Sequence, residues 1–214
     1  MEAVAKLVNA GIDQPVVVGS TPTGFPMLKN RIKALKDRPQ IITRPELLLL
    51  PQIPQPMHGL APRVILGKQW WDKIRKEAYR KLWFHCMACG THKSEVKGNS
   101  KWLDAHEKYD INYTIGRTYF VEAVPLCPFC HAFIHSGRLQ ALLDKRQITQ
   151  QRFAAIIRHG EQVLARAGLV KPPPYDGPMA EWENWRLVIG RKMYRPKYRS
   201  VEDWARHFDN LVEE

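Results

Sequence analysis

Two pairs of cysteines constrain this chain more than any other feature of its sequence. The protein has only four cysteines, and they form the pairs Cys86/Cys89 and Cys127/Cys130, each with two residues between. Tetrahedral zinc binds four thiolates at about 2.3 Å, and two such pairs can supply them. Disulfides are the alternative, but they are typical of small secreted chains, and the N-terminus lacks a basic-then-apolar signal pattern. The pairs therefore predict one structural Zn²⁺ in a closed, unreactive site.

Folded structure must separate the two pairs, because the 37 residues from 90 to 126 exceed the roughly 15–20 of a compact four-cysteine site. We expect strands over 102–107 and 121–126, and alternation over 109–113 and 118–122 predicts a β-hairpin that turns near Gly116. Pro128 suits the first turn of a helix. On that helix His131 and His135 lie one turn apart on one face, where two imidazoles can chelate a divalent ion.

The order of these features resembles the HNH endonucleases with zinc knuckles, a branch of the ββα-metal nucleases. The segments that carry the resemblance are 103–107, 126–131 and 134–135, and the match covers roughly residues 85–138. It implies an α+β fold, with a zinc-stapled ββα-metal core and helical and proline-rich flanking regions. It also implies a catalytic divalent ion (Mg²⁺, Mn²⁺ or Ni²⁺) held by His106, His131 and His135.

Two positions depart from the family pattern. Glu107 stands where the family has a second adjacent histidine as general base, and Glu122 stands where it has an asparagine. Either His106 or Glu107 can then take the proton from water, and the glutamate is the weaker base because its reference pKa is about 4.3 against about 6.5. Adjacent residues of a regular strand point opposite ways, so both cannot reach one ion. Asn112 is a further candidate for the missing asparagine.

The charge of the chain indicates its partner. A formal net charge of +12 favours a polyanion, and DNA is the expected one. The longest aliphatic run, Leu47–Leu50, is far too short to span a membrane, so we expect a cytoplasmic protein, in a bacterium or a phage-infected host cell. The candidate DNA contacts are Arg75, Lys76, Arg117, Arg138, Arg191 and Lys192.

The sequence divides into three expected domains. Residues 1–66 form an N-terminal helical and proline-rich arm, 67–145 the HNH-like core, and 146–214 a C-terminal helix followed by a basic, aromatic hairpin subdomain. Within them we expect a basic helix over 67–82 and a helix from the cap Thr149 to Gly168. We also expect Ser136 and Gly137 to end the histidine-bearing helix, and a hairpin that turns at Gly190.

The predicted function is that of a metal-dependent HNH-type endonuclease, which hydrolyses DNA phosphodiester bonds. One alternative is a catalytically inactive, zinc-stabilised DNA-binding module. The two glutamates favour it, because carboxylates repel a phosphate unless they are protonated or bound to metal. A second alternative is a protein-interaction factor of a phage or mobile element, built on the same scaffold.

Overall fold

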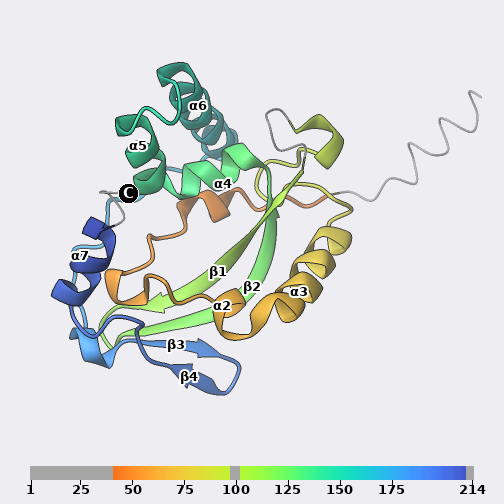
Figure 1. The fold of residues 1–214 in the computed structure, drawn as a ribbon. Coiled ribbons are helices and arrows are strands. Elements are labelled where there is room, and N and C mark those ends of the chain that lie inside the picture. The colour runs from red at the N-terminus through yellow and green to blue at the C-terminus, as the bar shows by residue number, and fades with distance from the viewer. Residues whose placement is uncertain (1–40, 97–101, 211–214) are drawn as a thin grey trace, which may run out of the picture. The chain divides into compact units, whose positions relative to one another are not determined.

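The structure, a computed structural model, describes residues 41–96 and 102–210 (Figure 1). The first forty residues of the expected N-terminal arm lie outside the described residues. The described residues belong to one compact unit with a mixed α/β fold, in which helices pack on a small sheet. None of the described helices is long and apolar enough to cross a membrane.

The sheet has four strands in the order β1-β2-β3-β4. Strands β1 (Asp104–Asn112) and β2 (Arg117–Leu126) form a long antiparallel hairpin, whose turn contains Gly116 at φ +65°. The predicted hairpin is therefore confirmed. Its register shifts between Lys108 and Tyr109, so Val121 has no partner on β1 and bulges from the ladder.

The second hairpin joins the same sheet. Strand β3 (Arg186–Ile189) pairs with β2 in parallel, and β4 (Lys192–Tyr194) pairs with β3 in antiparallel fashion. Gly190 adopts a φ of +59° at the turn, as the sequence predicts for a hairpin there. The sheet thus continues from the central part of the sequence into the C-terminal part.

Helices cover both faces of the β1–β2 hairpin. Helices α4 (Pro128–Ile134), α5 (Ser136–Asp144) and α6 (Gln150–Arg166) lie on one side, and α2 (Pro62–Ile65) and α3 (Gly67–Lys81) lie on the other (Figure 1). Helix α7 (Val201–Asn210) follows the second hairpin. The shorter 3₁₀ helices are η1 (Pro45–Leu49), η2 (Gln55–Met57), η3 (Lys93–Glu95) and η4 (Trp182–Asn184).

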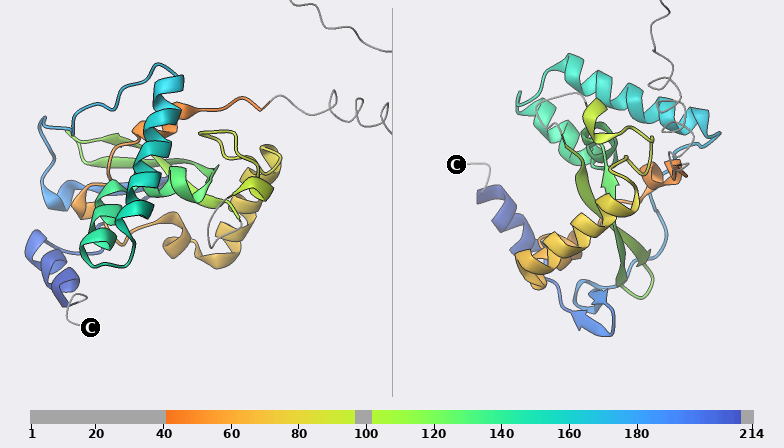
Figure 2. Two further views of the ribbon diagram at one scale, coloured as in Figure 1. Left: turned by 90° about the horizontal axis from the view of Figure 1, so that it is seen from above. Right: turned by 90° about the vertical axis from the view of Figure 1, so that its right-hand side faces the viewer.

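Helix α6 packs closely on α4, as Figure 2 shows from above. Its start is capped by Thr149, whose hydroxyl accepts a hydrogen bond from the backbone N–H of Arg152 at 3.1 Å. The close approach depends on Gly160, because a Cβ at that position would overlap the ring of Phe133 on α4. A glycine therefore sets the distance between the two helices.

Helix α4 ends earlier than expected. It stops at Ile134, and His135 interrupts the helix with φ −87° and ψ 50°. Ser136 and Gly137 then begin α5, where the backbone N–H of Leu139 donates to the carbonyl of His135 at 2.9 Å. The prediction of a glycine cap at Ser136–Gly137 is wrong. The kink allows both Ile134 and Leu139 to be buried, which one straight helix would not favour.

The main core draws on segments from η1 to α6. Leu47 and Leu48 of η1 are 1% exposed and pack with Leu126 of β2 and Ile156 of α6 around the four cysteines. The proline-rich segment is therefore packed on the body, as predicted. A second cluster, built from Met57, Trp185 and Leu187, lies under the other end of the sheet.

Candidate metal centres

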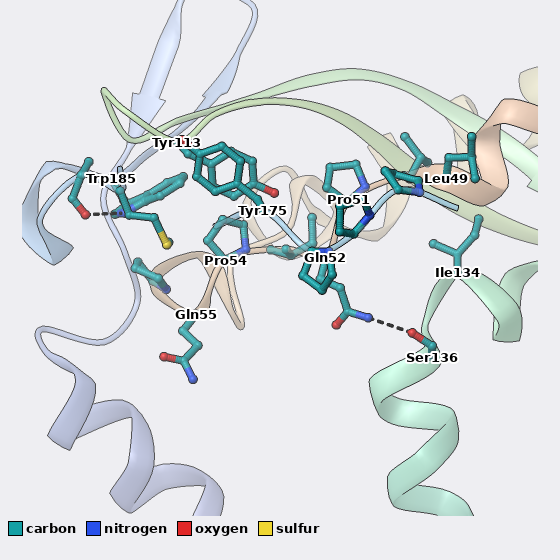
Figure 3. Close-up of a pocket in the computed structure, with 18 of the residues that line it drawn as sticks. Leu49, Pro51, Gln52, Pro54, Gln55, Tyr113, Ile134, Ser136, Tyr175 and Trp185 are labelled. Atoms are coloured by element: carbon teal, nitrogen blue, oxygen red, sulfur yellow. Dashed lines mark hydrogen bonds between the residues drawn. The ribbon is translucent and has the colours of Figure 1, made fainter. Parts of the chain in front are cut away.

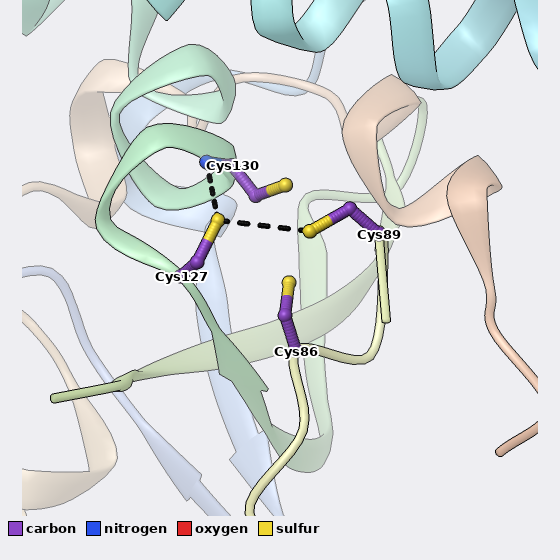
Figure 4. A group of neighbouring side chains, drawn as sticks. All are labelled: Cys86, Cys89, Cys127 and Cys130. Carbon is purple, nitrogen blue, oxygen red and sulfur yellow. Dashed lines mark hydrogen bonds between the residues drawn. The ribbon is translucent and has the colours of Figure 1, made fainter. Parts of the chain in front are cut away.

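The four cysteines lie together at the start of α4 (Figure 4). Their sulfur atoms are all within 4.8 Å of one another, and none forms a disulfide. The Sγ atoms of Cys89 and Cys127 are 3.8 Å apart, which agrees with the roughly 3.8 Å that tetrahedral geometry gives for Zn–S bonds of about 2.3 Å. Cys86 and Cys130 have no exposed surface. This donor set fits a closed structural zinc site.

Local hydrogen bonds position the sulfurs. In the first pair, Gly90 adopts φ +77° and its backbone N–H donates to the Cys86 carbonyl at 2.9 Å, which closes a tight turn. In the second pair, Cys127 caps α4 and its sulfur accepts from the backbone N–H of Cys130 at 3.4 Å. Hydrogen bonds from the Cys127 and Cys130 thiols lower the pKa of Cys89. These hydrogen bonds therefore favour a thiolate at Cys89, the form that binds metal.

A fifth side chain contacts this group from α6. The Nε2 atom of His159 is 3.3 Å from the sulfur of Cys130 and 3.8 Å from that of Cys127, and its ring packs edge-on against Phe129. It does not belong to the set of mutually close ligand atoms. His159 therefore lies beside the four sulfurs, within hydrogen-bond distance of two of them. Sequence reasoning missed it, because α6 shows only the apolar stripe of a core helix.

Three histidines form a second group between β1 and α4. The ligand atoms of His106, His131 and His135 all lie within 4.8 Å of one another, and the ring centroids are 4.8 to 5.4 Å apart. His106 is 7% exposed, and its Nδ1 atom has no hydrogen-bond partner among the described residues. A buried nitrogen without a partner is costly unless it binds something. The geometry thus unites the three histidines that the sequence singled out.

The electrostatics of this group suit a cation. Burial, with the neighbouring His135 and His131, lowers the pKa of His106 to about 3. Burial and His131 likewise lower the pKa of His135 to about 4. Both rings are therefore neutral at physiological pH, and each keeps a lone pair for a metal. The donor set of three imidazoles fits a divalent ion with open positions.

Asp104 orients one of these rings. Its Oδ2 atom accepts a hydrogen bond from Nδ1 of His131 at 3.1 Å, which leaves Nε2 of that ring free to bind a metal. Carboxylates commonly hold metal-binding histidines in this way. The sequence analysis did not identify Asp104, although its place two residues before His106 on the same face of β1 is a signal that could have found it.

Glu107 lies apart from the three histidines. It is 8% exposed, and Arg63 of α2 donates to its two carboxylate oxygens at 2.9 and 3.2 Å. Burial raises the pKa of Glu107, and the charge of Arg63 opposes that shift. His106 and Glu107 nevertheless line the same cavity of about 580 Å³, together with Arg63, His135 and Arg138. No sequence pattern pointed to Arg63, which is 44 residues away from Glu107.

The candidates for the missing asparagine have other contacts. Glu122 accepts from Arg44 at 2.6 Å and lies 3.8 Å from Lys108. The side chain of Asn112 accepts from the backbone N–H of Ile115 at 3.2 Å and closes the hairpin turn. Neither belongs to the three-histidine group.

The predicted DNA contacts fall into two sets. Arg75 pairs with Asp72 at 2.7 Å, and Arg117 donates to the carbonyls of Ile115, Gly116 and Asn184, so both have structural roles. The exposed cations are Lys76 on α3, Arg138 at the histidine cavity, and Arg191 and Lys192 at the turn of the second hairpin.

A larger cavity of about 1000 Å³ lies between the proline-rich segment and residues 171–182 (Figure 3). The rings of Tyr113 and Tyr175 stack there with centroids 4.1 Å apart, and Gln52 donates to the hydroxyl of Ser136 at 3.0 Å. Its lining includes no residue of the cysteine or histidine groups. This cavity is therefore separate from the candidate metal ligands.

No family model, curated protein or solved structure matches this chain. The resemblance to HNH endonucleases therefore rests on the motif residues alone. The structure defines a mixed α/β protein whose described part holds one four-cysteine group and one three-histidine group, each compact enough for a metal ion.

Proposed function

We propose that the protein is a metal-dependent HNH-type endonuclease that hydrolyses DNA phosphodiester bonds. The observation that carries the proposal is the three-histidine group on a hairpin and the helix after it, beside a cavity that contains Arg63 and Arg138. Neutral imidazoles suit a divalent cation, and two guanidinium groups suit a phosphate. The net charge of +12 agrees with a nucleic-acid substrate.

In this proposal His106, His131 and His135 hold Mg²⁺, Mn²⁺ or Ni²⁺. When bound, the ion supplies Lewis acidity to the phosphate and to the leaving oxygen. Arg63 and Arg138 bind phosphate oxygens at the cavity. The side chain of Arg63 is 52% exposed, so it can contact a substrate.

Glu107 is then the general base. His106 uses its ring nitrogen on the ion, whereas Glu107 lines the same cavity with its carboxylate paired to Arg63, which a substrate phosphate can draw away. Burial raises the pKa of its carboxylate, which makes it a stronger base than an exposed glutamate. A phosphate that draws Arg63 away would strengthen this effect, because Arg63 is the charge that opposes the shift.

The first experiment is cleavage of supercoiled plasmid with Mg²⁺, Mn²⁺, Ni²⁺ or a chelator. We expect metal-dependent nicking or linearisation that His106→Ala and His131→Ala abolish, while zinc content and melting temperature stay at wild-type values. His207→Ala, a histidine outside both groups, is the matched control and should cleave normally. Intact activity in both active-site variants would overturn the proposal. Failure of the wild type to cleave duplex, single-stranded or branched DNA would overturn it as well.

The role of Glu107 needs its own variant. Glu107→Gln should lower the cleavage rate at least a hundredfold at saturating metal and leave metal affinity unchanged, because general bases contribute about 10²–10⁴-fold. Full activity in this variant would assign proton transfer to another group.

A second candidate function is that of a DNA-binding module that does not cleave. The specific observation in its favour is the ion pair between Glu107 and Arg63, which occupies the carboxylate that cleavage would need. This function predicts salt-sensitive DNA binding with no metal-dependent cleavage. The plasmid experiment distinguishes the two.

A further inference from the structure

The end of helix α3 carries a tryptophan that folding does not explain. The backbone N–H of Trp83 donates to the carbonyl of Arg80 at 3.0 Å, and that of Phe84 donates to the carbonyl of Tyr79 at 2.8 Å. This pair of hydrogen bonds is the Schellman ending of a helix, with Trp83 at the position that adopts left-handed backbone angles. Its φ is +50°, and Phe84 follows at φ +58°.

Glycine is the residue that this position favours, because a Cβ makes the left-handed region costly. A large side chain could still be kept there if it filled the core. The side chain of Trp83 is instead 60% exposed. Neither the backbone nor the core therefore accounts for a tryptophan at this position, and a surface role remains.

The surroundings of Trp83 are strongly basic. Helix α3 has six basic and two acidic side chains, and both acids are paired within the helix, Asp72 with Arg75 at 2.7 Å and Glu77 with Lys81 at 2.8 Å. Lys73, Lys76 and Arg80 are exposed. Their spacing of three and four residues places them on one face of the helix, which leads to Trp83.

Next to Trp83 in the sequence, the ring of Phe84 forms a second aromatic group with Trp102, and a lysine lies over both rings. The ammonium group of Lys93 lies 3.7 Å from the ring centre of Phe84 and 4.5 Å from that of Trp102, and Trp102 is 43% exposed. Exposed aromatic rings among cations are the typical surface for single-stranded nucleic acid, where bases stack on the rings and phosphates contact the cations. A protein partner would not require so many positive charges.

We propose that Trp83 stacks on an unpaired nucleobase of DNA whose phosphates lie along Lys73, Lys76 and Arg80. The inference deepens the proposed function, since it assumes that DNA is the ligand. It adds that the protein prefers DNA with single-stranded character, such as a flap, a gap or an end. The preference would come from the α3 surface and would be independent of the metal centres.

The test measures binding of fluorescently labelled oligonucleotides, single-stranded and duplex, by anisotropy with no catalytic ion added. Trp83→Gly is the informative variant, because glycine fits the left-handed backbone and the fold should be retained. We expect about tenfold weaker binding of single strands, in line with alanine substitutions of stacking residues. Duplex binding should change less than twofold, and the melting temperature should stay equal or rise.

Three further variants complete the test. Trp83→Phe should recover part of the single-strand affinity, since phenylalanine keeps a stacking face. Met193→Ala removes an apolar side chain that is 63% exposed on β4, and it should bind like the wild type. Arg80→Ala should reduce the salt dependence of binding by about one ion.

Several outcomes would overturn the inference. They are single-strand binding by Trp83→Gly at wild-type strength, an equal loss for both forms of DNA, a marked fall in melting temperature, and no single-strand binding by the wild type. The nuclease proposal is tested separately by plasmid cleavage. Trp83→Gly should still nick supercoiled plasmid in the presence of metal, so the failure of one proposal does not imply the failure of the other.

Discussion

The cysteine group and the histidine group are neighbours that differ in exposure. Cys86, Cys127 and Cys130 are at most 5% exposed and are enclosed by the main core. In the histidine group only His106 is buried, and His135 lines a cavity that reaches Arg138 at the surface. The first group is closed and suits a structural ion. The second is open on one side and leaves room for a substrate.

A single helix of seven residues separates the two environments. Cys130 and His131 are consecutive on α4, so their side chains leave the helix about 100° apart. One points to the sulfur group and the other to β1. The four-cysteine group, at the start of α4, therefore also fixes the direction in which His131 points, and the open site depends on the closed one.

The largest expected effect follows from Cys130→Ser. Loss of one thiolate should release the zinc and cost several kcal/mol of folding free energy, because structural zinc contributes about 10–16 kcal/mol of apparent binding free energy in small domains. Zinc content by atomic emission and thermal unfolding by circular dichroism measure this. His131→Ser, one residue further on, is the matched control and should keep both zinc and fold. Equal melting temperatures for the two variants would contradict the view that the cysteine group, and not the histidine group, stabilises the fold.

Asp104→Asn tests the open site without removing a ligand. The variant loses the carboxylate that orients His131, and we expect affinity for Mn²⁺ to fall about 10–100-fold, as for other partners of metal-binding histidines. Titration followed by electron paramagnetic resonance measures that affinity. Asp110→Asn, an exposed position on the same strand, should bind Mn²⁺ like the wild type. Unchanged affinity in Asp104→Asn would show that the hydrogen bond has no part in metal binding.

Local sequence patterns predicted much of the fold and the two candidate groups. Alternation identified the β1–β2 hairpin, and capping residues identified α6. Spacing identified the four cysteines and the pair His131 and His135, whereas His106 came from the resemblance to HNH endonucleases. The residues that the sequence missed act over long separations, for example Arg63 on Glu107 and His159 on Cys130, which are 44 and 29 residues apart. No local pattern encodes such contacts, because they depend on how the elements pack.

The parallel pairing of β3 with β2 was missed for the same reason. The wrong prediction, a glycine cap at Ser136–Gly137, has a different cause. Glycine C-caps require a positive φ, and Gly137 does not have one. The burial of Ile134 and Leu139 outweighed the local signal, so tertiary packing decided where α4 ends.

The open site should also make the protein sensitive to acid. The pKa of His106 is about 3 in the folded protein and about 6.5 when unfolded, so the unfolded chain takes up the proton first. Its contribution to stability is complete above pH 6.5 and is lost as the pH falls. Between pH 7 and pH 5 the loss is about 2 kcal/mol. Urea unfolding without an added catalytic ion measures it. His106→Gln should reduce the pH dependence between those values and leave the part that His135 contributes through its own lowered pKa. An equal dependence in both proteins would mean that His106 is not buried in its neutral form.

The smallest expected effect concerns His159, which lies beside the four cysteines. His159→Gln removes the hydrogen bond to the Cys130 sulfur. Zinc transfer to a chromogenic chelator should then become up to about tenfold faster, because residues that hydrogen-bond to metal ligands change metal affinity by about that factor or more. Stoichiometry and fold should be unchanged, and Arg158→Gln, an exposed neighbour on α6, should behave like the wild type. Loss of the zinc itself in His159→Gln would make His159 a ligand. The four sulfurs would then not be the complete donor set, and the closed site would depend on α6 as directly as on the two cysteine pairs.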